Sequence, residues 1–290
     1  MRITFFSSDK PRERLLAEAF RVGAKQRGHC VTIVPLTGEP QVASAEMACM
    51  VGVKSRALFQ ANWDAGVHTL MFDKGYHRER VEGPIRTWEY WRMAYDGHHP
   101  TTKLAKMRAP DDRFGELGLR MKPWRNRGNK IVFAGASEKY HEFYDLPEPT
   151  TYATEILEWI HRHRRKLGLM DHELVYRPKP TWRNAVPIPG TTYSTREEDI
   201  VDVLKDAHAM VTHGSNACFE AMLAGTPCIV LGNAIAKPIS SDRLDDLRNP
   251  PLATDDLRAQ LLYNLTYCQW TMREMYEAKQ WDVLEQWIYD

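Results

Sequence analysis

The segment that decides which fold we expect is residues 209–232, with the sequence AMVTHGSNACFEAMLAGTPCIVLG. A short apolar run at 210–211 ends in the polar stretch 212–216. A helix-like segment follows, 225–227 closes it, and a second apolar run begins at 228. This order predicts strand, turn, helix and strand, which is one half of a Rossmann-like unit. The turn therefore lies where open α/β sheets bind ligands and where backbone N–H groups donate hydrogen bonds to phosphate.

The same segment resembles the C-terminal donor-binding signature of glycosyltransferases with the GT-B fold, H-G-S-N-x-x-x-E-A-x-x-x-G-x-P. The residues at those positions here are His213, Gly214, Ser215, Asn216, Glu220, Ala221, Gly225 and Pro227. The resemblance is closest to sugar transferases of the surface-polysaccharide type. It implies that an N-terminal domain binds the acceptor, that a C-terminal domain binds a nucleotide-sugar, and that the final helix crosses back to the first domain.

Both halves of the chain alternate strand-like and helix-like segments, as a doubly wound parallel sheet requires. Strands are expected at 2–8, 30–36, 47–53, 67–72, 130–133 and 173–176, and helices at 11–27, 55–66, 149–167 and 199–207. The last part of the chain, 255–289, has helical character. We therefore expect an α/β protein with two Rossmann-like domains and a C-terminal helical segment.

These patterns also divide the chain into three parts. Residues 1–127 are expected to form the N-terminal acceptor domain, which carries a basic, aromatic insertion. Residues 128–270 are expected to form the donor-binding domain, and 271–290 a helix that packs back on the first domain.

The composition favours a packed globular protein, because 43% of the 290 residues are hydrophobic and 27% are charged. The net charge of +1 produces no global field that would attract nucleic acid or membranes. No apolar run approaches the roughly 18 residues of a membrane span, and the N-terminus is typical of a strand instead of a signal peptide. The five cysteines are scattered, which favours reduced thiols, a cytoplasmic location and no metal site.

The donor site implied by the resemblance uses residues that follow predicted strands of the second domain. His213, Gly214, Ser215 and Asn216 would bind the diphosphate or the ribose, and Glu220 would accept hydrogen bonds from the ribose hydroxyls. Arg177 and Lys179 resemble a basic R-P-x-P element that faces the donor phosphates, and Gly135, Ser137 and Ser240 would complete the site. Each of these residues also has a purely structural interpretation, as a helix cap, a tight turn or surface charge.

Asp73 is the candidate catalytic base, and His77 is its rival. Asp73 ends an apolar strand, and inverting transfer needs a carboxylate or imidazole that takes the proton of the acceptor hydroxyl. A plain turn aspartate is the alternative interpretation. No metal is required, since cations and a helix end can offset the charge on the leaving group.

Residues 76–127 are rich in cations and aromatic side chains, and a short helix is expected near 88–95. Cations follow phosphates and aromatic rings stack on bases, so this segment suits a nucleic-acid acceptor. The alternative is a solvated face that covers a saccharide or a small molecule. The acceptor-binding candidates in and beside this segment are Lys74, Arg78, Trp88, Trp91, Arg92 and His98.

The leading hypothesis is a metal-independent glycosyltransferase that uses a nucleotide-sugar co-substrate, UDP-linked, and no other cofactor. Its acceptor would be double-stranded DNA carrying a hydroxymethylated pyrimidine, because compact GT-B enzymes of that kind modify phage DNA. The alternatives are a polysaccharide or small-molecule glycosyltransferase, a sugar-nucleotide epimerase of the same fold, and a non-catalytic nucleic-acid-binding protein on this scaffold.

Overall fold

The computed structural model describes residues 1–53, 56–77, 89–125 and 127–289, and it divides into two compact units. Unit 1 comprises Met1–Ala109 together with Asn264–Asp290, and unit 2 comprises Pro110–Tyr263. The chain therefore leaves unit 1 after residue 109 and returns to it at residue 264, earlier than the expected boundaries after 127 and 270.

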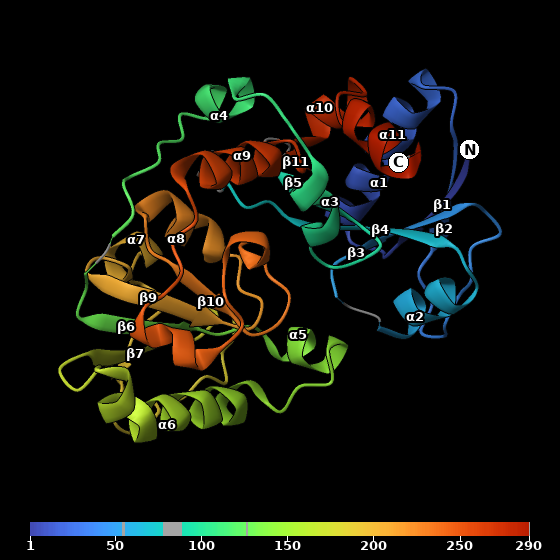
Figure 1. Ribbon diagram of the computed structural model, residues 1–290. Coiled ribbons are helices and arrows are strands. Elements are labelled where there is room, and N and C mark those ends of the chain that lie inside the picture. Colours follow the sequence, from blue (N-terminus) through green and yellow to red (C-terminus); the bar gives the residue numbers. More distant parts are fainter. Residues whose placement is uncertain (54–55, 78–88, 126, 290) are drawn as a thin grey trace. The chain divides into compact units, whose positions relative to one another are not determined.

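Unit 1 is built on a six-stranded sheet with the order β11-β5-β4-β3-β1-β2 (Figure 1). The four parallel strands confirm the predicted doubly wound arrangement and are β1 (Arg2–Ser7), β2 (Cys30–Pro35), β3 (Met47–Val51) and β4 (His68–Lys74). Two antiparallel strands extend it, β5 (Trp91–Tyr95) and β11 (Gln269–Trp270). The helices of unit 1 are α1 (Pro11–Gln26), α2 (Arg56–Asp64), α3 (Thr101–Lys106), α10 (Met272–Tyr276) and α11 (Trp281–Tyr289).

The helix expected near 88–95 is wrong where the structure describes it, because Trp91–Tyr95 is the strand β5. This segment pairs with β4 on one side and β11 on the other, and all five of its residues are buried. Aromatic residues favour strands, and two flanking strands decide the state of so short a segment. The predicted helix cap at residue 55 lies outside the described residues.

The C-terminal segment is integrated into unit 1 through its sheet and its core. Phe20 of α1 packs against Phe72 of β4, at 5.3 Å between ring centroids, and against Trp281 of α11, at 5.2 Å. Gly23 permits the contact between α1 and α10, since a Cβ there would lie 2.1 Å from the carbonyl oxygen of Met275. The strand β11 interrupts the continuous helical character that the sequence indicated for 255–289.

Unit 2 contains a five-stranded sheet with the order β10-β9-β6-β7-β8, in which every neighbouring pair is parallel. Its strands are β6 (Lys130–Ala134), β7 (Glu173–Arg177), β8 (Thr192–Tyr193), β9 (Ala207–Thr212) and β10 (Cys228–Val230). Its helices are α4 (Asp112–Glu116), α5 (Glu138–Phe143), α6 (Pro149–Leu167), α7 (Ile200–Val203), α8 (Cys218–Ala224), η1 (Lys237–Ile239), η2 (Leu244–Arg248) and α9 (Asp255–Thr266), the last of which ends in unit 1.

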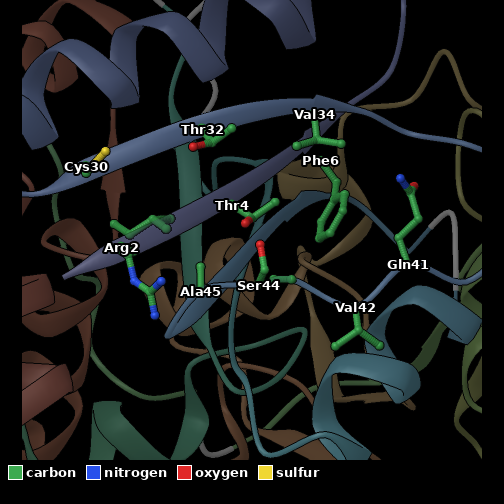
Figure 2. Close-up of a pocket in the computed structure, with 12 residues that line it drawn as sticks. Arg2, Thr4, Phe6, Cys30, Thr32, Val34, Gln41, Val42, Ser44 and Ala45 are labelled. Atoms are coloured by element: carbon green, nitrogen blue, oxygen red, sulfur yellow. The ribbon is translucent and has the colours of Figure 1, made fainter.

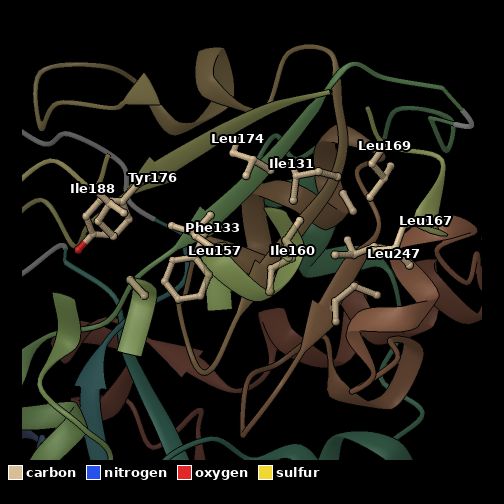
Figure 3. Packing of buried hydrophobic residues seen from close by; sticks show 14 residues of the cluster. Ile131, Phe133, Leu157, Ile160, Leu167, Leu169, Leu174, Tyr176, Ile188 and Leu247 are labelled. Carbon is tan, nitrogen blue, oxygen red and sulfur yellow. The ribbon is translucent and has the colours of Figure 1, made fainter. Parts of the chain in front are cut away.

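The helix α6 packs against the core of this sheet through four buried residues, Ala153, Leu157, Ile160 and Leu167. Figure 3 shows Leu157 and Ile160 of α6 beside Ile131 and Phe133 of β6. The same cluster includes residues of β7, β9 and β10. The helix begins where the sequence predicts, with Glu148 accepting from the backbone N–H groups of the first turn, and it ends at Gly168 in the left-handed conformation. The helix expected at 199–207 is shorter, since α7 ends at Val203, a turn follows, and β9 begins at Ala207.

Among the residues that the structure describes, no helix is both long enough and apolar enough to cross a membrane.

Candidate functional site

The carboxyl ends of β6, β7, β9 and β10 lie along one edge of the unit 2 sheet, because these strands are adjacent and parallel. The segments that leave this edge contain most of the predicted donor-binding residues. The loops after β6 and β7 are in contact, with the backbone N–H of Gly135 donating to the carbonyl of Arg177 at 2.8 Å. The topology therefore brings the Gly135–Ser137, Lys179 and His213–Asn216 positions to the same edge of the sheet.

Thr212 fixes the turn between β9 and α8. Its hydroxyl donates to the carbonyl oxygen of Ala134 at 2.7 Å and accepts from the backbone N–H of Ser215 at 3.0 Å. The Ser215 hydroxyl in turn accepts from the backbone N–H of Ala217 at 3.3 Å. This fully buried threonine ties the turn to the neighbouring strand β6. Thr212 was not among the predicted site residues, although a polar residue at the end of an apolar strand is a signal of this kind.

The imidazole of His213 is enclosed by three tyrosine rings. Nδ1 lies 3.1 Å from the hydroxyl of Tyr140, and the rings of Tyr140, Tyr144 and Tyr152 lie 5.7, 5.9 and 5.7 Å from the imidazole centroid. Burial, together with the charges of His141 and Lys237, lowers the pKa of His213 to about 4. His213 is therefore neutral at pH 7 and acts as a hydrogen-bonding ring, without a positive charge for a diphosphate.

Two glycines make room for this arrangement. A Cβ on Gly214 would lie 1.8 Å from the Tyr140 hydroxyl oxygen, and a Cβ on Gly232 would lie 2.1 Å from Cε1 of His213. Real Cβ atoms do not approach other atoms so closely. Both positions therefore require glycine because a side chain occupies the space, and neither has the positive φ that favours glycine.

Arg177 is buried and its guanidinium faces the segment after β8. It donates to the Ser194 hydroxyl at 2.8 Å, to the carbonyl of Glu198 at 2.6 Å and to the carbonyl of Thr195. These contacts hold the segment 194–198 against β7. Lys179, two residues further along, is half-buried at the carboxyl edge of the sheet.

Glu220 and Ser240 lie on different elements of unit 2. Glu220 is half-buried in the first turn of α8. Ser240 follows η1, and its hydroxyl donates to the carbonyl of Lys237 at 3.5 Å. The Lys237 ammonium pairs with Asp242 at 3.0 Å and donates to the carbonyl of Val230 at 3.4 Å, which ties η1 to the end of β10.

In unit 1, Asp73 is held by a buried arginine. Its Oδ2 accepts from Nη2 of Arg92 at 3.0 Å and lies 3.5 Å from Nε2 of His98, and its Oδ1 accepts from the backbone N–H of Lys74 at 2.8 Å. The Asp73 side chain remains 33% exposed, whereas that of Arg92 is 1% exposed. The carboxylate is therefore oriented from one side and open to solvent on the other. His77 is half-buried, with its ring 5.6 Å from that of Tyr90.

The predicted acceptor-binding residues do not form one exposed face. Trp91, Arg92 and His98 are buried, and the Trp91 ring lies 4.3 Å below the guanidinium of Arg12 from α1. Lys74 is exposed, with its ammonium 3.8 Å from Glu89. Arg78 and Trp88 lie outside the described residues. A ring must be exposed to stack on a base, and the Trp91 ring is buried.

Unit 1 also contains a cavity of about 590 Å³ over β1 and β2. Figure 2 shows it lined by Thr4 and Phe6 of β1, by Thr32 of β2 and by the connection to β3, which includes Gln41 and Ser44. None of the predicted site residues lines this cavity.

The described residues contain no group of three or more His, Cys, Asp or Glu side chains that could hold a metal ion.

No protein-family model and no curated protein matches this sequence. Among solved structures, the chain is similar to Thermosulfurimonas dismutans KpsC, beta Kdo 2,4 transferase, with 13% identity and a TM-score of 0.53 over 93% of this chain and 91% of that one. It is equally similar to Thermosulfurimonas dismutans KpsC, beta Kdo 2,7 transferase, with 13% identity and a TM-score of 0.53 over 95% of this chain and 97% of that one. These likenesses confirm the predicted architecture: the chain has the GT-B fold.

Proposed function

We propose that this protein is a glycosyltransferase that moves a sugar from a nucleotide-sugar to an acceptor hydroxyl. The observation that carries the proposal is the turn between β9 and α8. There, the residues His213–Asn216 of the donor signature leave an interior strand of a parallel sheet, and Thr212 fixes them to β6. Ligands of open α/β sheets bind at this edge.

The donor would be held by groups along the carboxyl edge of the unit 2 sheet. Glu220 has a half-buried carboxylate that suits two vicinal ribose hydroxyls, since it can accept two hydrogen bonds. Ser215 and Asn216 would contact the phosphates. Lys179 is the better source of positive charge for them, because the guanidinium of Arg177 is engaged with the segment 194–198. The further candidates for contact with the donor are Gly135, Ser137 and Ser240.

Asp73 would act as the general base in this proposal. Its carboxylate takes the proton of the acceptor hydroxyl while the hydroxyl oxygen bonds to the anomeric carbon. The bond from that carbon to the nucleotide breaks, and the phosphate oxygen keeps the electron pair. Protein cations and backbone N–H groups would stabilise this leaving group. Because these protein groups take the place of a metal ion, we expect full activity in excess EDTA.

The acceptor that we favour is a saccharide or a small molecule. Three of the six residues proposed to bind DNA, namely Trp91, Arg92 and His98, are buried, and the net charge of the chain is only +1. A protein that bound duplex DNA would need an exposed set of cations along the phosphates. The two similar structures are Kdo transferases, which also supports a sugar-transfer reaction.

Calorimetric titration with UDP, dTDP, GDP and CMP, and with their sugar conjugates, tests the donor site. We expect saturable binding of one nucleotide, with UDP as the first candidate. Glu220→Ala should weaken that binding at least tenfold, because the ribose hydroxyls lose a charged acceptor. Glu158→Ala, at an exposed position of α6, is the matched control. Absence of binding by every nucleotide would refute the proposal, and salt-dependent binding of duplex DNA alone would favour the nucleic-acid-binding alternative.

A further inference from the structure

Three polar side chains form a row across the antiparallel part of the unit 1 sheet. Arg92 of β5 lies directly opposite Asp73 of β4, and on its other side directly opposite Gln269 of β11. Directly opposed residues of antiparallel strands project from the same face. This face is the one opposite α1, since the neighbouring residue Trp91 packs under Arg12 of that helix.

Arg92 stands at the centre of a buried polar cluster. Nη2 contacts Oδ2 of Asp73 at 3.0 Å and Nε2 of His98 at 2.5 Å, and Nη1 contacts Nδ1 of His99 at 3.0 Å. A guanidinium can only donate, so each of these two ring nitrogens accepts. Both imidazoles are therefore neutral, and the proton of each is on its other nitrogen.

Among the described residues of this cluster, the ion pair with two formal charges joins Arg92 and Asp73. The Tyr76 hydroxyl lies 3.4 Å from Nδ1 of His99, and burial raises the pKa of Tyr76, so the phenol stays protonated. Lys74 projects away to Glu89, which also pairs with Arg12 at 2.6 Å. Arg92 is therefore a cation in direct contact with the Asp73 carboxylate, and its own side chain is only 1% exposed.

Gln269 fixes the backbone that follows Asp73. Its Oε1 accepts from the backbone N–H groups of Tyr76 at 2.7 Å and His77 at 3.0 Å. The turn is tightly packed, because a Cβ on Gly75 would lie 2.9 Å from the same oxygen. The row therefore holds both candidate bases, Asp73 through its carboxylate and His77 through its backbone.

We propose that Arg92 is a positioning residue that keeps the Asp73 carboxylate charged and aimed toward solvent, so that Asp73 and not His77 accepts the proton of the acceptor hydroxyl. This inference rests on the proposed glycosyltransferase function. Arg92 reaches the carboxylate and the two imidazoles at once because its planar guanidinium presents donors in several directions. The compact ammonium of a lysine could not make the same three contacts.

The first test measures the titration of Asp73 directly, by the carbon-13 chemical shift of its carboxyl group in the wild type and in Arg92→Gln. Loss of a cation in hydrogen-bond contact should move the titration midpoint up by about 1–3 pH units. The buried Arg258, which stacks on Trp124 and pairs with Asp255 in unit 2, provides the control Arg258→Gln. In that control the midpoint of the Asp73 titration should equal the wild-type midpoint. An unchanged midpoint in Arg92→Gln would overturn the inference.

The second test uses the acid limb of the pH profile of kcat/KM for sugar transfer. In Arg92→Gln the midpoint of the acid limb should move to higher pH by the same amount as the midpoint of the carboxyl titration. The value of kcat/KM at the optimum pH should fall at least tenfold. Arg258→Gln should change neither the midpoint nor the shape of the acid limb. If Arg92→Gln does not fold, Arg92→Lys replaces it in both tests. A lysine variant with wild-type rate, limb and carboxyl titration would also overturn the inference.

The two tests separate this inference from the proposed function. If the wild type binds no nucleotide-sugar, the function fails, and the carboxyl titration still decides whether Arg92 controls the charge of Asp73. If the wild type transfers sugar and the Arg92 variants keep a wild-type acid limb, the function stands and the positioning role fails.

Discussion

The hydroxyl oxygen of Tyr140 lies 3.1 Å from Nδ1 of His213, and it also lies 3.3 Å from the carbonyl oxygen of Asn233. One phenol thus links three segments at the carboxyl edge of the unit 2 sheet, namely the start of α5, the end of β9 and the segment after β10. Because Nδ1 is engaged with Tyr140, the orientation of the imidazole is fixed. Nε2 is the nitrogen through which His213 would contact a donor.

Tyr140→Phe should weaken nucleotide binding about three- to tenfold, because it removes a hydrogen bond of about 1 kcal/mol that orients His213. Tyr152→Phe is the matched control, since it also loses a phenolic hydroxyl, from a ring whose centroid lies 5.7 Å from that of the imidazole. Calorimetric titration of both variants with the nucleotide that binds the wild type makes the comparison. Equal losses in the two variants would contradict an orienting role for the Tyr140 hydroxyl.

Gly214→Ala should destabilise the protein by about 1–3 kcal/mol, because its Cβ would lie 1.8 Å from the Tyr140 hydroxyl oxygen. Gly115→Ala is the control, since no atom lies within 4 Å of a Cβ built there. Urea denaturation gives the free energy of unfolding of each variant. If Gly214→Ala has wild-type stability, the tyrosine and the turn are not packed as tightly as described.

The stability of the protein should fall as the pH decreases from about 6.5 to about 4. His213 has a pKa of about 4 in the folded protein, below its ordinary value of 6.5, so the unfolded chain binds a proton that the folded protein does not. The stabilisation is therefore complete above pH 6.5 and is lost progressively below it. His141, whose pKa is also lowered by burial, should add to the same slope.

His213→Gln should flatten this pH dependence, measured as the free energy of unfolding in urea at intervals between pH 7 and pH 4. The control is His161→Gln, at an exposed position of α6, which should retain the wild-type slope. A His213→Gln slope that equals the wild-type slope would mean that this imidazole is not held neutral by burial.

Asp73→Asn should lower kcat for sugar transfer by about 10²- to 10⁴-fold and leave nucleotide binding unchanged, because a general base acts only in the chemical step. Asp245→Asn, which breaks an exposed ion pair with Lys166, should leave kcat near the wild-type value. Initial rates and calorimetric titration of each variant provide the two readings. Retained activity in Asp73→Asn combined with a loss in His77→Gln would assign the base to His77.

Much of the fold was predictable because short stretches of sequence determine where its helices and strands begin and end. The helix Pro149–Leu167 has apolar residues at helical spacing, proline in its first turn and glycine after its last residue, so its limits were predicted correctly. The strands β1, β6 and β7 are short apolar runs, and polar or small residues follow each of them. The turn between β9 and α8 was identified because His213–Asn216 stand between two such elements.

Other parts of the site depend on contacts between segments that are distant in sequence. Tyr140 approaches His213 only because β6 and β9 are neighbours in the sheet. The direction of the Arg177 side chain depends on where the segment 194–198 returns after β8. No local pattern specifies which side chain occupies the space beside a given strand end.

Local sequence patterns were enough to predict the parallel strands of both sheets and the place of the turn at Thr212–Asn216, because strand, helix and turn preferences act over a few neighbouring residues. The secondary structure and burial of residues 91–99 depend instead on contacts with distant parts of the chain. Pairing of Trp91–Tyr95 with β4 and with β11, which lies far along the chain, turned a basic, aromatic segment into an interior strand. That pairing buries Arg92 and places its guanidinium on Asp73, since the hydrogen bonds of a sheet are set by whichever strands lie on either side.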